Sequence, residues 1–371
     1  MRAVESVDNI LQKDILRKPD LVSLLSMAPD KAKLLFRKAQ KVKAETVGRK
    51  VYLRGLIEYS NICSKNCLYC GIRKGNAQYT RYRLSEEEVI LAAKYAWRNR
   101  FASIVLQAGE VRSPEFIAVI EHLLKEITRI TNREMHITLS LGEQTPETYR
   151  RWYEAGAHRY LLRIETSNQA LYRKLHPHDE QHDFSGRITA LKALRTIGYQ
   201  VGTGVMIGLP FQTLSDLADD LIFFREFDVD MVGMGPYIEH EDTPLFHLRG
   251  SIPSREDRLA LSLKMVAILR ILMKDINIAA TTAMQALDRR GRQKALQAGA
   301  NVVMPNLTPS AYRQSYLLYA DKPGVQDDAG GSTERMEEDI RSAGDTIAYG
   351  EWGDSKHFNE KRKRDEHLSE S

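Results

Sequence analysis

The segment from Val51 to Gly71, VYLRGLIEYSNICSKNCLYCG, joins a β-rich run to a loop that holds every cysteine of the 371-residue chain. The valine, isoleucine and tyrosines of Val51–Ser60 are typical of a strand. Cys63, Cys67 and Cys70 follow with the spacing C-x₃-C-x₂-C. Such tight clustering does not fit a secreted disulfide framework, in which paired cysteines are spread over several loops.

Further β-rich runs alternate with amphipathic helix patterns along the chain. Ser85 and Glu88 form a capping-box signature, which predicts that the first of these helices begins at Ser85. Eight strand–helix alternations over roughly 260 residues predict a (β/α)₈ barrel of the TIM type in the α/β class. A doubly wound sheet is the alternative, but no G-x-G-x-x-G follows the first strand. The later runs are Ser103–Ala108, His136–Leu141, Tyr160–Thr166, Val201–Leu209, Met231–Ile238, Ile278–Ala283 and Val302–Pro305.

The ends of the chain differ from this alternation. Residues 1–50 show helical apolar spacing and predict an N-terminal helical extension to a barrel over 51–320. Residues 321–353 are predicted to form a linker and a short C-terminal helix. The charged residues 354–371 lack an apolar period and predict a polar, disordered tail.

Composition excludes several classes of protein. The hydrophobic content of 43% and charged content of 28% are ordinary for a globular protein, and a net charge of +5 is too small to indicate nucleic-acid binding. No apolar stretch reaches the length of a membrane span, and acids and bases mix from the N-terminus, unlike a signal or transit peptide. We therefore expect a cytoplasmic protein that binds neither nucleic acid nor membrane, and a monomer.

The three cysteines favour an iron–sulfur cluster over the other uses of clustered thiols. Three cysteines in one Gly- and Asn-bearing loop cannot all point into a core, and a structural zinc site usually needs four ligands. Iron–sulfur clusters normally take four thiolates, so three leave one iron with an open coordination position. The loop follows the first strand, which places it at the C-terminal mouth of a barrel, where active sites are built.

Charged residues on the fourth predicted strand also indicate a site. Alternation along this strand puts Arg159, Arg163 and Glu165 on one face. Buried charges are costly unless they are paired or bound to a ligand, so we favour an anion and ribose site over a structural ion pair.

At this point the residues resemble a known family. The C-x₃-C-x₂-C motif with Tyr69 before the third cysteine resembles the radical S-adenosylmethionine (SAM) enzymes. The resemblance implies that Cys63, Cys67 and Cys70 ligate a [4Fe–4S] cluster whose open iron binds SAM. It implies reductive cleavage of SAM to methionine and a 5′-deoxyadenosyl radical, with an electron from a low-potential donor.

Longer runs, such as TLSLGE, HRYLLRIETSN and GANVVMPNLTPSAYRQSY, narrow the resemblance to the HydE subfamily of [FeFe]-hydrogenase maturases, within the biotin synthase and methylornithine synthase-like group. It implies that Gly109 and Glu110 meet the methionyl amine, Arg187 the carboxylate, Glu165 the ribose and Met206 the adenosyl group. The residues implied to line a deeper substrate cavity are Thr138, Ser140, Arg159, Arg163, Thr281, Thr282, Tyr312 and Arg313.

The subfamily implies a small iron–cysteine substrate carrying carbonyl and cyanide, or an amino-acid derivative, with partner maturases and a scaffold protein. Ala108 departs from the serine that relatives often carry. The segment His176–Asp183 is longer than the family pattern, and we interpret it as a flexible polar loop rather than a metal site. The alternatives are a methylornithine-synthase-like lysine mutase and a non-catalytic electron-transfer protein. Sulfur insertion of the biotin-synthase type needs cysteines that the chain lacks.

Overall fold

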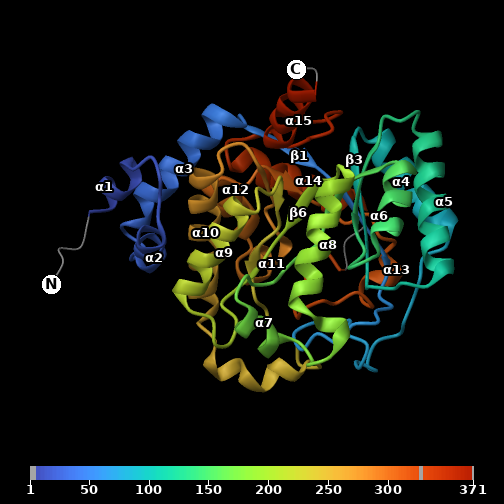
Figure 1. Cartoon of the computed structure of the whole chain (residues 1–371), viewed down its shortest axis with the longest axis horizontal. Helices are drawn as coiled ribbons and strands as arrows, with labels where there is room; N and C mark the ends of the chain where they lie inside the picture. The colour runs from blue at the N-terminus through green and yellow to red at the C-terminus, as the bar shows by residue number, and fades with distance from the viewer. Residues whose placement is uncertain (1–5, 326–328, 370–371) are drawn as a thin grey trace.

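The structure is a computed structural model that describes residues 6–325 and 329–369. Its centre is a set of parallel strands enclosed by helices (Figure 1). Seven strands pair in the order β10-β8-β6-β5-β4-β3-β2. They are β2 (Gly55–Ser60), β3 (Ser103–Ala108), β4 (His136–Ser140), β5 (Ala157–Leu161), β6 (Gln200–Thr203), β8 (Met231–Val232) and β10 (Asn277–Ile278).

The predicted first strand closes this sheet into a barrel. Its first half is β1 (Lys50–Leu53), which pairs in parallel with β11 (Val302–Val303), and its second half is β2, which pairs with β3. Parallel bridges join Ala279 to Val302 and Leu56 to Asn306, so β11 contacts both edges of the seven-stranded sheet. The predicted (β/α)₈ barrel is confirmed.

Several predicted strands have different bounds in the structure. The runs Ile278–Ala283 and Val302–Pro305 are shorter, as β10 and β11. The run Tyr160–Thr166 begins earlier, as β5, and its later part makes only the isolated bridge between Glu165 and Val205. The fifth and sixth predicted strands are each interrupted, by Gly204 and Gly233 respectively. A Cβ on Gly204 would lie 1.9 Å from the carbonyl oxygen of Gly233, so the two backbones approach too closely there for any side chain. Short parallel strands β7 (Met206–Ile207) and β9 (Gly235–Pro236) pair beyond this point.

Helices cover the outside of the barrel, and their apolar faces form the core with the strands. Ser85 caps the first of them in a capping box with Glu88, as predicted. The barrel helices are α4 (Glu86–Arg98), α5 (Pro114–Ile130), α6 (Pro146–Glu154), α7 (Gln169–Leu175), α8 (Phe184–Ile197), α9 (Leu214–Glu226), α10 (Arg255–Leu272), α11 (Thr282–Leu287), α12 (Gly291–Ala298) and α13 (Ser310–Arg313), with 3₁₀ helices η1 (Glu180–His182) and η2 (Pro244–Ser251).

The N-terminal extension is helical, as predicted. Helices α1 (Val7–Gln12), α2 (Lys18–Ser26) and α3 (Ala32–Thr46) lie on one flank of the barrel, against α9 and α10 (Figure 1). No helix of the described part of the chain is long and apolar enough to cross a membrane.

The prediction of a disordered tail over residues 354–371 is wrong for most of its length. After α14 (Ala329–Ser342) and β12 (Thr346–Ile347), the chain forms α15 (Lys356–Ser369). His357 pairs with Asp228 and Asp275, and Lys361 pairs with Asp230, so ion pairs help to hold this helix against the barrel. The apolar period on which the prediction relied does not detect docking of this kind. Residues 326–328 of the predicted linker, and 370–371, lie outside the described residues.

Candidate active site

The cysteine loop leaves the C-terminal end of β2 and folds against the end of the next strand. The backbone N–H of Ser64 donates to the carbonyl of Glu110 at 2.8 Å, and the N–H of Glu110 donates to Cys63 Sγ at 3.3 Å. A Cβ on Gly109 would lie 2.3 Å from the carbonyl oxygen of Ile62. Glycine is therefore required at position 109 if the loop is to approach this strand.

The three thiols share one poorly solvated site. All three cysteines are free, and burial raises the pKa of each thiol, that of Cys67 to about 12. The charge of Cys63 raises the pKa of Cys67 further, and both raise that of Cys70, as expected for neighbouring groups. Three thiolates whose charges repel one another need a cation to neutralise them. The donor set therefore fits an iron–sulfur cluster.

A buried ion network lies beside the cysteines. Glu110 Oε1 is 2.8 Å from Arg112 Nη2 and 3.4 Å from Lys65 Nζ, and Glu143 Oε2 is 3.3 Å from the same Lys65 nitrogen. The N–H of Glu143 donates to Glu110 Oε2 at 2.8 Å. Arg187 Nε lies 2.5 Å from Glu143 Oε1 as an ion pair without hydrogen-bond alignment. Burial opposes the charge of Arg187, but Glu143 holds the pKa of that guanidinium well above its usual range.

Lys65, Arg112 and Glu143 are the members of this network that sequence reasoning missed. Glu143 had a usable signal, because Gly142-Glu143 follows one strand as Gly109-Glu110 follows its neighbour. The carboxyl ends of parallel strands meet at one edge, so two such pairs should lie close together. Lys65 and Arg112 had no such signal.

Arg163 and Glu165, which follow β5, form a second ion pair of the site. The Arg163 guanidinium donates to both carboxylate oxygens of Glu165 at 2.9–3.1 Å. Arg187 Nη1 donates to the carbonyl of Arg163 at 3.0 Å, which links this pair to the ion network. Burial opposes the charge of Arg163, but Glu165 raises its pKa above the usual range.

An apolar wall adjoins these charges. Tyr69 and Met206 pack against a small buried cluster. The N–H of Met206 donates to the carbonyl of Glu165 at 3.1 Å. Burial raises the pKa of Tyr69 well above its usual value, and the charges of Cys67 and Glu165 add to the rise. The buried members of the cluster are Leu171, Leu175, Leu209, Tyr237 and Leu245.

The predicted small hydroxyl residues lie in β4 (Thr138 and Ser140) and at the start of α11 (Thr281 and Thr282). Thr138 Oγ1 is buried and has no hydrogen-bond partner among the described residues, so it is open to a ligand group or water. Ser140 is the half-buried last residue of β4. Thr281 donates to the carbonyl of Met234 at 3.3 Å, and the hydroxyl of Thr282 lies 2.8 Å from that of Tyr319.

Arg159 lies elsewhere, contrary to prediction. Its guanidinium is fully buried and bonded to Asp354 Oδ1 at 2.6 Å and Ser103 Oγ at 2.6 Å. Ser103, like the nearby His136, begins its strand, so Arg159 occupies the N-terminal end of the barrel, opposite the cysteine loop. The strand register explains the difference: β5 begins at Ala157 and places Arg159 near its start.

Tyr312 and Arg313 are also occupied by protein partners. Tyr312 packs on Tyr82 with ring centroids 4.9 Å apart, and Glu88 hydrogen-bonds its hydroxyl. Arg313 is buried and donates to the carbonyls of Thr308 and Asn306 at 2.7 and 3.0 Å. Arg313 therefore supports the turn after β11 rather than presenting a free cation.

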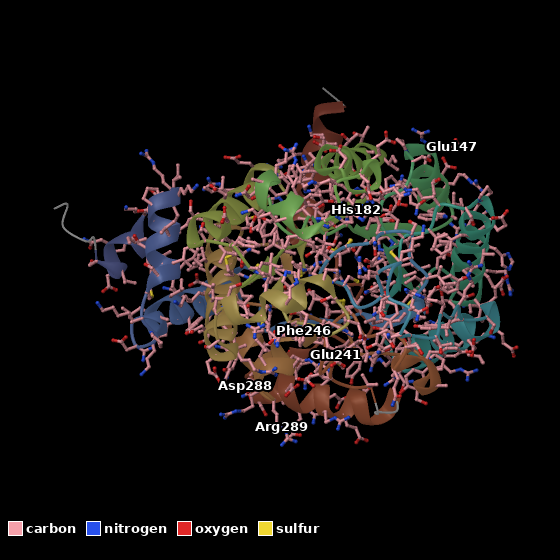
Figure 2. All side chains as sticks on the ribbon, turned by 90° about the horizontal axis from the view of Figure 1, so that it is seen from below. Glu147, His182, Glu241, Phe246, Asp288 and Arg289 are labelled. Atoms are coloured by element: carbon pink, nitrogen blue, oxygen red, sulfur yellow. The ribbon has the colours of Figure 1, made fainter. Side chains whose placement is uncertain are left out.

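The segment His176–Asp183 is not the flexible loop that we predicted. His176 and His182 are buried, and His182 Nε2 accepts the N–H of Asn66 at 2.9 Å. His176 Nε2 lies 3.3 Å from the hydroxyl of Tyr69. Two histidines of this segment therefore contact the cysteine loop; His182 is labelled in Figure 2. The polar composition of the segment could not indicate these contacts.

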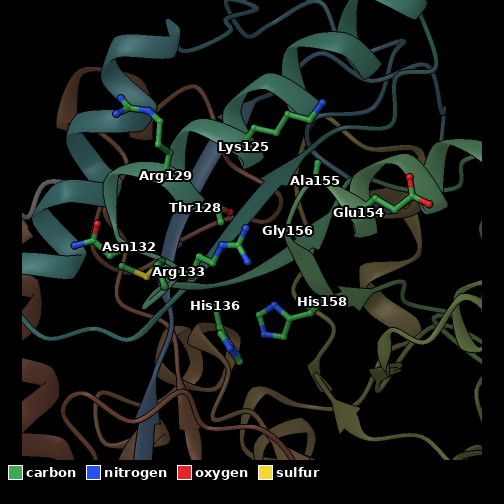
Figure 3. A pocket seen from close by; sticks show the side chains of 11 residues that line it. Lys125, Thr128, Arg129, Asn132, Arg133, His136, Glu154, Ala155, Gly156 and His158 are labelled. Atoms are coloured by element: carbon green, nitrogen blue, oxygen red, sulfur yellow. The ribbon is translucent and has the colours of Figure 1, made fainter.

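A surface hollow lies at the opposite end of the barrel. It has a volume of about 740 Å³ and is lined by basic residues including Arg129, Arg133 and His158 (Figure 3). The side chains of His136, His158 and Asp354 meet beside it. The Arg159 guanidinium, 2.6 Å from Asp354, makes this group unfavourable for a cation.

Comparison with known proteins agrees with the geometry of the cysteine loop. Residues 57–224 match the radical SAM superfamily. The chain is 47% identical to the [FeFe] hydrogenase maturase subunit HydE of Thermotoga maritima over 289 residues, which cover 78% of this chain and 79% of that protein. It is 28% identical to a 3-methylornithine synthase of Methanosarcina acetivorans over 81% of this chain and 83% of the relative.

A solved structure shows the same fold. The crystal structure of a methylornithine synthase superposes with a TM-score of 0.78 at 25% identity, over 93% of this chain and 97% of that one. The [FeFe]-hydrogenase maturase HydG superposes with a TM-score of 0.75 at 19% identity, over 92% of this chain and 74% of that one, which supports the fold alone. By its cysteine motif, its barrel and its likeness to the Thermotoga protein, the chain belongs to the radical SAM superfamily and, within it, to the HydE family of [FeFe]-hydrogenase maturases.

Proposed function

We propose that this enzyme cleaves SAM reductively and acts in the assembly of the two-iron subcluster of [FeFe]-hydrogenase. The observation that carries the proposal is the meeting of three half-buried thiols with the Glu110–Glu143–Arg187 network at the barrel mouth. The 47% identity to a HydE maturase supports the biological role.

Cys63, Cys67 and Cys70 would hold a [4Fe–4S] cluster, and SAM would bind at its open iron. The bound cluster and SAM supply the chemistry, which yields methionine and a 5′-deoxyadenosyl radical. The protein's own residues bind and orient: Glu110 accepts the methionyl amine, and Arg187 pairs with the methionyl carboxylate. Gly109 lets the loop sit close enough for both contacts.

On the nucleoside side, Glu165 would accept hydrogen bonds from the ribose hydroxyls. Arg163 already fixes the direction of that carboxylate, so little freedom is lost on binding. Tyr69 and Met206 supply an apolar wall suited to the adenosyl group. The closed barrel then excludes water from a reactive radical.

The substrate is a small molecule that would enter deeper in the barrel. Thr138, Ser140, Thr281 and Thr282 offer hydroxyl groups there. Hydroxyl donors suit a small iron–cysteine complex with carbonyl and cyanide ligands, delivered by a partner maturase. We further propose a low-potential electron donor, delivery of the product to a scaffold protein, and action as a cytoplasmic monomer.

A lysine mutase of the methylornithine-synthase type is the second candidate, because relatives with that activity share 28% identity. A lysine substrate carries two amines that need carboxylate partners. In this proposal SAM occupies Glu110 and Glu165, and Glu143 is paired with Arg187 and Lys65. This charge balance favours the maturase.

One assay separates the two candidates. The protein would be reconstituted with iron and sulfide without oxygen, reduced, and supplied with SAM and either lysine or the iron–cysteine complex. We expect four irons per chain and 5′-deoxyadenosine formation that rises with the iron–cysteine complex alone. A rise with lysine only would reject the maturase role.

A further inference from the structure

Lys65 is a buried lysine in the cysteine loop, where a lysine side chain would ordinarily be solvated. Its ammonium is 3.4 Å from Glu110 Oε1 and 3.3 Å from Glu143 Oε2, and it also donates to the carbonyl of Gln181. An ammonium has three N–H donors, and these contacts give it three acceptors. One side chain thus ties the cysteine loop to the ends of β3 and β4 and to η1.

The charges around Lys65 form a nearly balanced set. The carboxylates of Glu110 and Glu143 are both buried. Two buried cations face them: Arg187, with 11% of its side chain exposed, and Lys65, with 4%; the third cation, Arg112, is 50% exposed. Without Lys65, the buried carboxylates would outnumber the buried cations, and an unpaired buried charge is costly.

This balance matters when a ligand takes one of the cations. Within the described part of the chain, the carboxylate that forms an ion pair with Arg187 is that of Glu143. If Arg187 pairs with the methionyl carboxylate, Glu143 must share or give up that partner. Lys65 is the remaining buried cation in contact with Glu143.

We propose that Lys65 is a positioning residue for SAM: it neutralises Glu143, so that Arg187 can pair with the methionyl carboxylate, and it fixes the Glu110 carboxylate that receives the amine. This inference rests on the proposed function of the site. Lys65 touches neither the substrate nor the reacting atoms and acts through Glu110, Glu143 and Arg187.

A second consequence concerns the cluster itself. Lys65 lies between Cys63 and Cys67 in the sequence, and it contacts Glu110, whose backbone N–H donates to Cys63 Sγ at 3.3 Å. Adding an electron to a cluster is easier beside a positive charge. Loss of the Lys65 charge should therefore make the midpoint potential of the cluster more negative, whereas loss of a purely structural contact would not.

The test compares Lys65→Met and Lys65→Arg with the wild-type protein, each reconstituted without oxygen. Lys74→Met is the matched control, because Lys74 is an exposed lysine of the same loop whose backbone N–H, not its side chain, contacts Lys65. The measurements are iron and sulfide content, SAM affinity from the change in the spectrum of the reduced cluster, and the midpoint potential.

We expect Lys65→Met to hold iron, to bind SAM roughly 10- to 100-fold more weakly, and to show a more negative potential. Lys65→Arg keeps the charge and should recover most of both properties, while Lys74→Met should match the wild type. In Lys65→Met/Glu143→Gln the unneutralised carboxylate is gone, so SAM should bind more tightly than to Lys65→Met alone.

Wild-type SAM affinity in Lys65→Met, or no recovery in the double variant, would overturn the proposal. If Lys65→Met does not take up iron, we expect the Lys65→Met/Glu143→Gln variant to take up iron and to bind SAM. Failure of the double variant to do so would also contradict the positioning role of Lys65. Absence of a cluster or of SAM binding in the wild-type protein would instead reject the proposed function.

Discussion

Arg163 holds the carboxylate of Glu165, two residues further along the chain, through hydrogen bonds of 2.9 and 3.1 Å from Nε and 2.9 Å from Nη2. Glu165 adopts a φ of +64°, which L-residues other than glycine rarely occupy. The guanidinium is itself anchored on the carbonyls of Gly233 and Val205. A strained residue held by so many contacts points to a carboxylate whose direction matters.

Replacing Glu165 should weaken SAM binding and leave the cluster in place. We expect Glu165→Gln to bind SAM about tenfold more weakly, because an amide is a poorer acceptor than a carboxylate for ribose hydroxyls. Iron content and SAM affinity of the reconstituted protein are the measurements. Glu147→Gln, at an exposed position on α6 (Figure 2), is the control. Unchanged affinity in Glu165→Gln would remove the ribose role.

Cys70→Ala should abolish the cluster and turnover together. Two thiolates cannot hold a four-iron cluster with one open position, so iron content and the visible absorbance of the cluster should fall to background. 5′-Deoxyadenosine formation measures the second effect. Full SAM cleavage by this variant would rule out the proposed chemistry.

Gly109→Ala tests the close approach of the cysteine loop. The added Cβ would lie 2.3 Å from the Ile62 carbonyl oxygen and 2.6 Å from Cys63 Cβ, so the loop must move. We expect iron uptake to fall severalfold and the free energy of unfolding to drop by about 1–3 kcal/mol. Gly250→Ala is the matched control, since a Cβ there meets no atom within 4 Å. Equal iron uptake in the two variants would contradict this account.

The sequence was sufficient to predict the barrel and the cysteine loop because both are local patterns. Strand ends predicted one mouth, and the structure does bring the end of β3 at Glu110 against Cys63. Arg187 lies on α8, and only the family resemblance pointed to it. Arg159 shows the limit of that reasoning. Alternation put it on the same face as Arg163, but height along the barrel depends on register, and its partner Asp354 lies 195 residues away.

Long-range charge pairing was the other feature that local patterns could not predict. In the sequence Lys65 cannot be distinguished from an ordinary loop lysine, because its partners Glu110 and Glu143 follow two other strands. His182 likewise looks like part of a polar loop in the sequence, because the Asn66 N–H that it accepts comes from a distant segment. In both cases burial follows from partners distant in sequence, so no window of neighbouring residues contains the signal.

The docking of α15 should depend on pH through His357. Its Nε2 lies 2.6 Å from Asp228 Oδ1 and its Nδ1 lies 3.1 Å from Asp275 Oδ1. The hydrogen bond with Asp275 raises the pKa of His357 above its usual value, burial opposes the rise, and Asp228 adds to it. Because the folded-state pKa is the higher one, this stabilisation is complete below the unfolded-state pKa of about 6.5 and is lost as the pH rises through the folded-state pKa.

His357→Gln should therefore lower the free energy of unfolding at pH 6 by about 1 kcal/mol and have a smaller effect at high pH. Urea unfolding of both proteins at pH values from 6 to 9 gives the difference, and hydrogen exchange of the α15 amides locates it. His247→Gln, at an exposed histidine, is the control for a general effect of losing one imidazole. Lys361 keeps its ion pair with Asp230 in all variants, so α15 should weaken rather than detach. A pH-independent difference between wild type and His357→Gln would show that the imidazole docks this helix without its charge.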